Sequence, residues 1–380
     1  MGFNLNRIRN VDFNFSSEDV EVLKKDWQSY TRKKQQYPNK FKGKGIVFTA
    51  GGVGYLTCAF VSISLLRKNG CKLPIEIWHR GNEISREAMY KFASLGVMFR
   101  DFFEVERLPP SGYALKPLAI IHSKFEEVLF MDADNNCVSD PEYLFSSAGY
   151  VHLGSMFWPD YWYTSKKNSI WEIIDSEAYD IPEQESGQLL VNKKKCWKEL
   201  QLCLYFNKLS TYYYKILLGD KDTFKFAWHA LNTPYFMISK SVGSSGYLVQ
   251  DKFYGHTMVQ HDEHDDIVFL HRNLMKWDIT KNSELTWELI KGFVNSNRNG
   301  NVIIQPAPKG NIAIDLRGET KQIIFSEKFP ELESNCIGFL DQWRESKFFK
   351  DFLIYSHFAK NRFVDGKEFR LDEMDQTVHV

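Results

Sequence analysis

Two aspartates that follow a short apolar run are the residues of this sequence best placed to do chemistry. Asp132 and Asp134 come directly after residues 127–131, a run typical of a strand buried on both faces. Carboxylates two residues apart lie on the same side of an extended chain, and ligands of open α/β sheets bind beyond the carboxyl ends of the strands. Two neighbouring anions repel each other unless a cation lies between them, and Mg²⁺ or Mn²⁺ takes ligands from carboxylates and substrate phosphates. The pair therefore predicts a metal site for a diphosphate; the alternative is a solvated turn that carries two aspartates.

A histidine and a lysine later in the chain have a similar position. His271 follows an apolar strand predicted over residues 267–270, and Lys276 comes five residues later. A histidine at a strand end is a candidate third metal ligand, with the lysine near the phosphates, and a structural histidine is the alternative. The late histidines match no zinc signature in their spacing.

A glycine-rich loop follows the first predicted strand, residues 45–49. The loop reads Ala-Gly-Gly-Val-Gly and leads into a helix predicted over residues 55–68. A strand, a glycine loop and a helix in this order bring backbone N–H groups to a nucleotide. Thr57 stands where the third glycine of G-x-G-x-x-G would be, and Arg80, instead of an acidic residue, follows the second strand. A nicotinamide dinucleotide site is therefore disfavoured, and Arg80 is predicted either to pair with a phosphate or to be an ordinary surface arginine.

The regular alternation of short strands and helices ends near residue 140. Up to that point it predicts a right-handed, mostly parallel α/β unit. Residues 154–163 are predicted to be an aromatic loop, either a sugar platform or a surface loop folded on its own rings. Residues 193–218 are predicted to be a long helical segment. After residue 301 we expect a small antiparallel sheet and then a closing apolar helix with the aromatic residues Trp343, Phe348, Phe352 and Tyr355.

Composition excludes several classes of function. The 380 residues include 48 Lys plus Arg and 48 Asp plus Glu, so no basic field exists to hold nucleic acid. Aromatic residues make up 15%, which is compatible with a carbohydrate ligand. No apolar run approaches the ~18 residues of a membrane span. The cysteines are scattered and are predicted to be reduced and buried: Cys58, Cys71, Cys137, Cys196, Cys203 and Cys336.

Five sequence blocks in a fixed order resemble glycosyltransferase family 71, the fungal Golgi α-mannosyltransferases, and more distantly the retaining enzymes of family 8. They are VFTAGGVGYL, GYALKPLAIIHSKFEEVLFMDADN, ESGQLLVNK, GDKDTFKFAW and FLHRNLMK, and they cover about residues 43–277. The resemblance implies a GT-A fold, which is Rossmann-like with a mostly parallel sheet flanked by helices, and here with a small C-terminal β/helical extension. We expect residues 1–42 to form a helix and linker, 43–300 the catalytic domain, and 301–380 strands and a helix packed on it.

The resemblance also implies roles for individual residues. Asp134 would ligate the metal, Asp132 would hold the ribose or the metal's waters, and His271 would complete the metal site. The residues expected to bind the nucleotide donor are Thr49, Ala50, Gly51, Arg80, Lys116, Asp132 and Lys276. The residues expected around the transferred sugar are Glu185, Gln188 and Asp222. Glu185 and Asp222 are both candidates for a nucleophile, and the sequence does not choose between them.

The expected function is metal-dependent, retaining transfer of a hexose. The resemblance implies mannose from GDP-mannose, Mn²⁺ or Mg²⁺, and a glycan hydroxyl as acceptor. The alternatives are a family-8-like transferase that uses UDP-glucose or UDP-galactose, and a non-catalytic nucleotide-sugar or carbohydrate-binding protein. The anchor expected of a Golgi enzyme is missing, so the chain as given is expected to be cytoplasmic, or to lie in the Golgi lumen if it is an unanchored fragment of a type II membrane protein.

Overall fold

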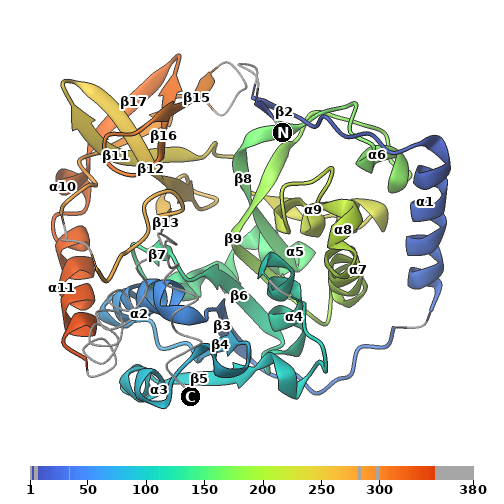
Figure 1. Cartoon of the computed structure of the whole chain (residues 1–380), viewed down its shortest axis with the longest axis horizontal. Helices are drawn as coiled ribbons and strands as arrows, with labels where there is room; N and C mark the ends of the chain where they lie inside the picture. The colour runs from blue at the N-terminus through green and yellow to red at the C-terminus, as the bar shows by residue number, and fades with distance from the viewer. Residues whose placement is uncertain are drawn as a thin grey trace, which may run out of the picture.

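Two β-sheets with helices packed against them make up the structure (Figure 1). The structure is a computed structural model, and it describes residues 2–3, 7–33, 35–110, 112–280, 284–295 and 300–346.

The first sheet is mixed, and most of its strand pairs are parallel. Its parallel core is β6-β3-β4-β5, and antiparallel β9 joins this core to β8. In sheet order the strands are β1 (Gly2–Phe3), β2 (Ile8–Asn10), β8 (Ser155–Thr164), β9 (Pro182–Asn192), β6 (Glu127–Asp132), β3 (Lys44–Thr49), β4 (Ile75–His79) and β5 (Val97–Asp101), and β10 (Phe236–Met237) pairs with β8. Strands β3, β4 and β6 are short, mostly apolar and almost fully buried, as strands covered on both faces must be, whereas the edge strand β5 is half-buried. The predicted α/β class with a mostly parallel sheet flanked by helices is confirmed.

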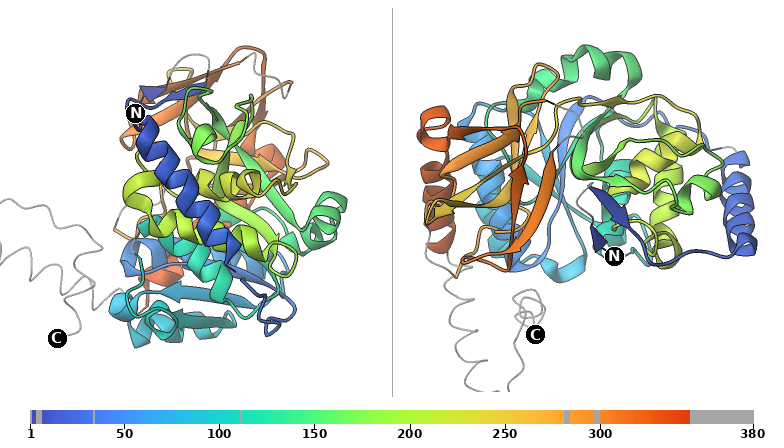
Figure 2. Two further views of the ribbon diagram at one scale, coloured as in Figure 1. Left: turned by 90° about the vertical axis from the view of Figure 1, so that its right-hand side faces the viewer. Right: turned by 90° about the horizontal axis from the view of Figure 1, so that it is seen from above.

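Helices cover both faces of this sheet (Figure 2). On one face lie α2 (Gly52–Lys68) and α3 (Arg86–Ala93), and α11 (Leu332–Arg344) packs on α2. On the other lie α4 (Leu115–His122), α7 (Trp197–Lys208), α8 (Ser210–Tyr213), α9 (Lys221–Ala230) and α6 (Ile170–Ile173), and α1 (Ser17–Arg32) packs on α6 and α7. The helix predicted near the start of the chain is confirmed as α1: Ser16 caps it by accepting the Asp19 backbone N–H.

The second sheet is antiparallel throughout the described residues. Its order is β15 (Asn301–Pro306), β16 (Ile312–Arg317), β12 (Lys252–His261), β11 (Gly243–Val249), β14 (Leu289–Phe293) and β17 (Thr320–Ile324), and β13 (Ile267–His271) pairs with both β12 and β7 (Asn135–Cys137). The strands predicted after residue 301 are present, and they share this sheet with strands that precede residue 300. The three-part division of the chain stays a proposal.

Several predicted elements differ from the observed ones. The aromatic loop predicted over residues 154–163 is wrong: these residues form β8, which is almost entirely buried. Pro159 lies where the register between β8 and β9 shifts, a place that tolerates proline within a sheet. The helical segment predicted over 193–218 is divided into α7 and α8 by a turn at Leu209.

The remaining predictions concern cysteines, the last helix and membrane spans. All six cysteines are free and buried, as predicted. Trp343 lies on α11, whereas Phe348, Phe352 and Tyr355 lie outside the described residues. Among the helices that the structure describes, none combines the length and the apolar character needed to cross a bilayer.

Candidate functional site

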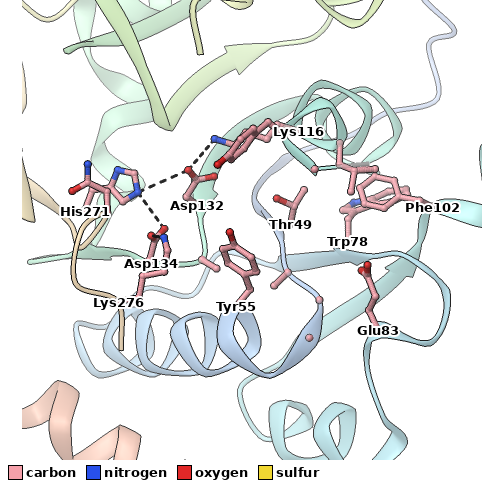
Figure 3. Close-up of a pocket in the computed structure, with 18 residues that line it drawn as sticks. Thr49, Tyr55, Trp78, Glu83, Phe102, Lys116, Asp132, Asp134, His271 and Lys276 are labelled. Atoms are coloured by element: carbon pink, nitrogen blue, oxygen red, sulfur yellow. Dashed lines mark hydrogen bonds and ion pairs between the residues drawn. The ribbon is translucent and has the colours of Figure 1, made fainter. Parts of the chain in front are cut away.

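A cavity of about 710 Å³ opens at the carboxyl ends of β3, β4 and β6 (Figure 3). This volume lies in the usual range of small-molecule sites, roughly 300–1,000 Å³. Its lining consists of Thr49, Ala50, Gly51, Gly52, Tyr55, Trp78, Glu83, Phe102, Gly112, Tyr113, Leu115, Lys116, Asp132, Ala133, Asp134, His271, Asn273 and Lys276. Seven of the predicted nucleotide and metal residues therefore reach one cavity together with the predicted strand-end histidine.

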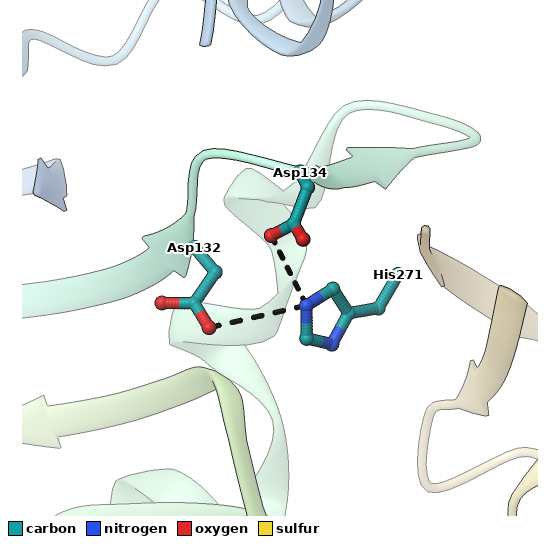
Figure 4. A group of neighbouring side chains, drawn as sticks. All are labelled: Asp132, Asp134 and His271. Atoms are coloured by element: carbon teal, nitrogen blue, oxygen red, sulfur yellow. Dashed lines mark hydrogen bonds and ion pairs between the residues drawn. The ribbon is translucent and has the colours of Figure 1, made fainter. Parts of the chain in front are cut away.

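Asp132, Asp134 and His271 come together at one wall of this cavity (Figure 4). One ligand atom from each lies within 4.8 Å of the others. His271 Nε2 is 3.1 Å from Asp134 Oδ1 and 3.9 Å from Asp132 Oδ2. Ligands at right angles around a cation with bonds of ~2.1 Å lie ~3.0 Å apart, so the three side chains fit a small divalent cation with little adjustment. An oxygen, oxygen and imidazole set suits Mn²⁺ well.

The charges around these side chains favour a positive charge between them. Burial alone raises the pKa of the Asp134 carboxyl, but His271 and Lys276 hold that pKa well below its usual range. Burial alone lowers the pKa of His271, yet Asp134 and Glu185 raise it to about 10. The carboxylates thus stabilise a cation at the imidazole, which is either a proton or, with the imidazole neutral, a metal ion.

A strand pair of the second sheet explains how His271 meets the aspartates. Immediately after Asp134 the chain enters β7, which pairs with β13 so that Asn135 lies opposite His271. The Arg272 N–H donates to the Asp134 carbonyl at 3.0 Å, just beyond this pair. A ligand 137 positions away in the sequence is therefore fixed by backbone hydrogen bonds.

Glu185 lies behind His271, on β9. Its Oε1 is 3.5 Å from His271 Nδ1 and accepts the Gly187 N–H at 2.7 Å. A Cβ at Gly187 would collide with the His271 ring, so only glycine allows this approach. A carboxylate on the outer nitrogen of a histidine is the arrangement that orients metal-binding histidines. Glu185 does not line the cavity, and we propose a positioning role for it.

Lys116 connects the aspartates to a further carboxylate. Its Nζ is 2.8 Å from Asp132 Oδ2, 3.4 Å from Asp220 Oδ2 and 3.0 Å from Ser186 Oγ. Burial alone lowers the pKa of Lys116, but Asp132 and Asp220 raise it above its usual value. Burial raises the pKa of Asp220 to about 6. Asp220 was not among the predicted site residues. It stands at the N-cap position of α9, where an aspartate is common, but its side chain accepts from Ser186 Oγ instead of capping the helix.

Lys276 forms an ion pair with Asp134 at the mouth of the cavity, and 42% of its side chain is exposed. Burial alone lowers its pKa, but Asp134 raises the pKa above the ordinary lysine value. Its ammonium group is therefore charged and within reach of a ligand's phosphates.

Besides Glu185, three predicted residues do not line the cavity. Gln188 is fully buried and accepts from Asn135 Nδ2 at 2.6 Å. Asp222 accepts the Gln184 N–H and pairs with Lys225 at 2.9 Å, inside the fold. The Arg80 guanidinium lies over the Phe103 ring instead of in the cavity.

The end of the cavity away from His271 is lined by residues that were not among the predicted site residues. Trp78 and Phe102 form apolar walls, and the Glu83 carboxylate points into the space beside them (Figure 3). Tyr55, Tyr113 and Asn273 complete the lining. They come from different strand ends and helix starts, so no spacing in the sequence could have grouped them.

A family model described as "Mannosyltransferase putative" matches residues 43–183 and 179–262. The chain is similar to the α-1,2-mannosyltransferases MNN24 of Candida albicans (29% identical, 58% of this chain and 38% of that one), MNN2 of Saccharomyces cerevisiae (29%, 58% and 46%) and MNN21 of Candida albicans (30%, 60% and 44%). The matches thus span less than half the length of these relatives. Among solved structures, the galactosyltransferase LgtC with donor and acceptor sugar analogues gives a TM-score of 0.37 at 17% identity, over 48% of this chain and 70% of that one.

Proposed function

The chain belongs to the mannosyltransferase family whose model it matches, glycosyltransferase family 71, and from this membership we propose that it transfers mannose from GDP-mannose to a glycan hydroxyl with formation of an α linkage. The observation that carries the proposal is the cluster of Asp132, Asp134 and His271 on the wall of a nucleotide-sized cavity. The names of the relatives make a 1,2 linkage the first to test.

Binding of the donor follows from the charges in the cavity. Asp132, Asp134 and His271 would hold Mn²⁺ or Mg²⁺, which when bound supplies Lewis-acid stabilisation of the charge that develops on the leaving diphosphate. Lys276 and Lys116 donate hydrogen bonds to anionic oxygens in the same region. The N-terminus of α2 also borders the cavity, and its first turn has no side-chain cap, so its N–H groups are available to a phosphate.

Cleavage of the bond between the sugar and the diphosphate leaves positive charge on the anomeric carbon. Retention of configuration needs either a carboxylate nucleophile or attack by the acceptor hydroxyl on the same face. Glu185 contacts His271, and Asp222 pairs with Lys225, so neither carboxylate lines the cavity. This arrangement supports same-face attack, with the diphosphate oxygens next to Lys116 and Lys276 as acceptors of the hydroxyl proton.

The test is a transferase assay with the Asp134→Asn variant. Wild-type protein with GDP-mannose, Mn²⁺ and an α-mannoside should release GDP and extend the acceptor, and UDP-glucose and UDP-galactose should not replace the donor. Asp134→Asn should lower turnover by ~10²–10³-fold, since several kcal/mol of electrostatic stabilisation depend on this ligand.

The control for this assay is Asp140→Asn, which changes a helix-capping aspartate of the same segment that does not line the cavity. It should leave turnover unchanged. Full activity of Asp134→Asn would remove the metal from the mechanism. Binding of nucleotide sugars without any transfer would instead favour a non-catalytic binding protein.

A further inference from the structure

One carboxylate in the cavity has no part in holding the metal or the diphosphate. Glu83 ends the short turn Gly81–Glu83 that follows β4, and it lies at the end of the cavity away from His271 and Asp134 (Figure 3). Its Oε2 accepts the Arg80 N–H at 3.0 Å. Its Oε1 makes no hydrogen bond to the part of the chain that the structure describes, although the residue is half-buried. The carboxylate therefore offers acceptor capacity to a ligand in the cavity.

The surroundings of Glu83 combine an acceptor carboxylate with an apolar backing. The Trp78 and Phe102 rings border this end of the cavity with centroids 5.2 Å apart, and because both are buried they make its floor apolar without adding a hydrogen-bonding group. Trp78 Nε1 already donates to Glu76 Oε2 and gives no donor to the cavity. On the other side Gly51 lies so close that a Cβ there would collide with Glu83 Oε2, although its backbone φ of −150° is open to any residue. Glycine at this position thus leaves room for the carboxylate.

The chemistry of the nucleobases decides which ring fits. Guanine presents two adjacent donors, the N1–H and the 2-amino group, which match the two oxygens of one carboxylate. Uracil presents a single N–H between two carbonyl oxygens, and those oxygens would face the carboxylate with like charge. Adenine presents an amino group beside an unprotonated nitrogen and satisfies only one carboxylate oxygen. Discrimination is large when a buried polar group is left without its partner by the wrong ligand.

We propose that Glu83 recognises the guanine base of the nucleotide donor by accepting hydrogen bonds from its N1–H and 2-amino group, and that it selects guanine over uracil. The inference rests on the proposed function, because it requires a nucleoside diphosphate to lie along the cavity with its phosphates at the Asp132–Asp134–His271 end. Burial raises the pKa of the Glu83 carboxyl, and two donors on the base would favour its ionised form.

A purely structural role for Glu83 makes a different prediction, and a neighbouring aspartate provides the matched control. Asp101 Oδ1 accepts the Gly81 N–H at 3.0 Å and the Phe103 N–H at 2.9 Å, so it holds the same turn, but it does not line the cavity. If Glu83 only holds this turn, its replacement and that of Asp101 should have similar effects on nucleotide binding.

The experiment measures binding of GDP, inosine diphosphate and UDP to the whole chain by calorimetry in the presence of Mn²⁺. Inosine diphosphate keeps the N1–H of guanine and lacks only the 2-amino group. Wild-type protein should bind GDP at least about tenfold more tightly than either of the other two. Glu83→Gln replaces one acceptor oxygen with a donor, and it should weaken GDP binding by ~10–100-fold and bring GDP and inosine diphosphate within about threefold of each other. Asp101→Asn should keep the wild-type ratio.

The possible results distinguish failure of the role proposed for Glu83 from failure of the proposed transferase function. If Glu83→Gln still prefers GDP over inosine diphosphate as the wild type does, the role of Glu83 is overturned. A wild-type preference for UDP would overturn it as well. Failure of folded wild-type protein to bind any of the three nucleotides overturns the proposed function itself. Thermal unfolding followed by circular dichroism establishes that each variant is folded.

Discussion

Glu185, predicted from the sequence to surround the sugar, lies behind His271 and not in the cavity. As a nucleophile it would have to face the sugar, but its Oε1 lies 3.5 Å from His271 Nδ1. A carboxylate in this position fixes the tautomer and orientation of a histidine ligand and increases its basicity. Its contribution should therefore appear in metal affinity.

We expect Glu185→Gln to raise the Mn²⁺ concentration needed for half-maximal activity by ~10–100-fold, because the imidazole loses its anionic partner. Excess Mn²⁺ should restore most of the turnover. The measurement is a Mn²⁺ titration of GDP release at saturating GDP-mannose. A nucleophile would behave differently, since no amount of metal would then restore the rate.

Glu183 is the matched control on the same strand. Its carboxylate forms ion pairs with Arg9 and Lys221, and its Oε2 lies 2.5 Å from Lys221 Nζ. The residue does not line the cavity. Glu183→Gln leaves buried cations with one anionic partner fewer, so it should lower the free energy of unfolding by ~3–5 kcal/mol. The Mn²⁺ dependence of the folded protein should stay as in the wild type.

The site residues that the sequence could predict are those at strand ends. Asp132, Asp134 and His271 each follow an apolar run, and the carboxyl ends of neighbouring strands meet at one edge of a sheet. Glu83 and Asp220 were not predictable in this way, because each looked like an ordinary turn or capping residue. Their roles depend on neighbours from other strands, Gly51 and Lys116.

The pairing of β7 with β13 is the element that assembles the metal site. Asn136, on β7, donates from Nδ2 to the carbonyls of Asp134 and Leu270, at 3.2 and 3.1 Å. These bonds attach the strand of the aspartates to the strand of His271. The site thus depends on a strand pair of the second sheet as well as on the parallel sheet.

Asn136→Ala should lower the free energy of unfolding by ~1–3 kcal/mol, because it leaves two buried carbonyl groups without this donor. It should also weaken Mn²⁺ binding, since the distance between Asp134 and His271 is no longer fixed. Urea unfolding and the Mn²⁺ titration measure the two effects.

Asn69→Ala tests whether the effect on Mn²⁺ is specific. Asn69 Nδ2 donates to the Cys137 carbonyl at 3.0 Å, at the far end of the same strand. Its loss should cost ~1 kcal/mol of stability and leave the Mn²⁺ dependence unchanged. An equal change of Mn²⁺ dependence in both variants would contradict the role given to Asn136.

Strand β8 shows why some elements could not be predicted. Its Pro159 and Asp160 are typical of a turn, yet Asp160 is buried and pairs with Lys221 at 2.6 Å. The partner belongs to α9, about sixty positions later in the chain, so the local pattern gave no sign of it. A charge that is neutralised by a distant residue can occupy a sheet interior, which periodicity alone does not reveal.

The chain has 48 acidic and 48 basic residues, and some of these charged side chains are buried together inside the fold. Arg9, Glu183, Asp160 and Lys221 form a buried ionic cluster that joins β2, β8, β9 and α9. Such a cluster adds little net stability, but removal of one member leaves an uncompensated charge. His256 and His261 are buried in the same fold, and they make the stability of the molecule depend on pH.

Acid should destabilise the protein below about pH 6.5. Burial lowers the pKa of His256 to about 3 and that of His261 to about 4, whereas both titrate near ~6.5 in an unfolded chain. As the pH falls below 6.5 the unfolded chain binds protons that the folded state does not, so each histidine removes up to ~1.4 kcal/mol of stability per pH unit. Asp220, whose pKa burial raises to about 6, acts in the opposite direction as the pH falls through that value.

Comparison of variants isolates one histidine from these opposing effects. His256 Nε2 lies 3.2 Å from the Thr286 carbonyl and its Nδ1 lies 2.9 Å from Thr257 Oγ1, and the amide of glutamine can make both contacts without titrating. Between pH 6.5 and 4.5, urea unfolding should therefore show a slope for His256→Gln that is smaller than the wild-type slope by ~1.4 kcal/mol per pH unit. The side chain of His264 is 74% exposed, so His264→Gln should keep the wild-type slope. Equal slopes for all three proteins would mean that His256 takes up its proton in the folded state, and burial would then not control its titration.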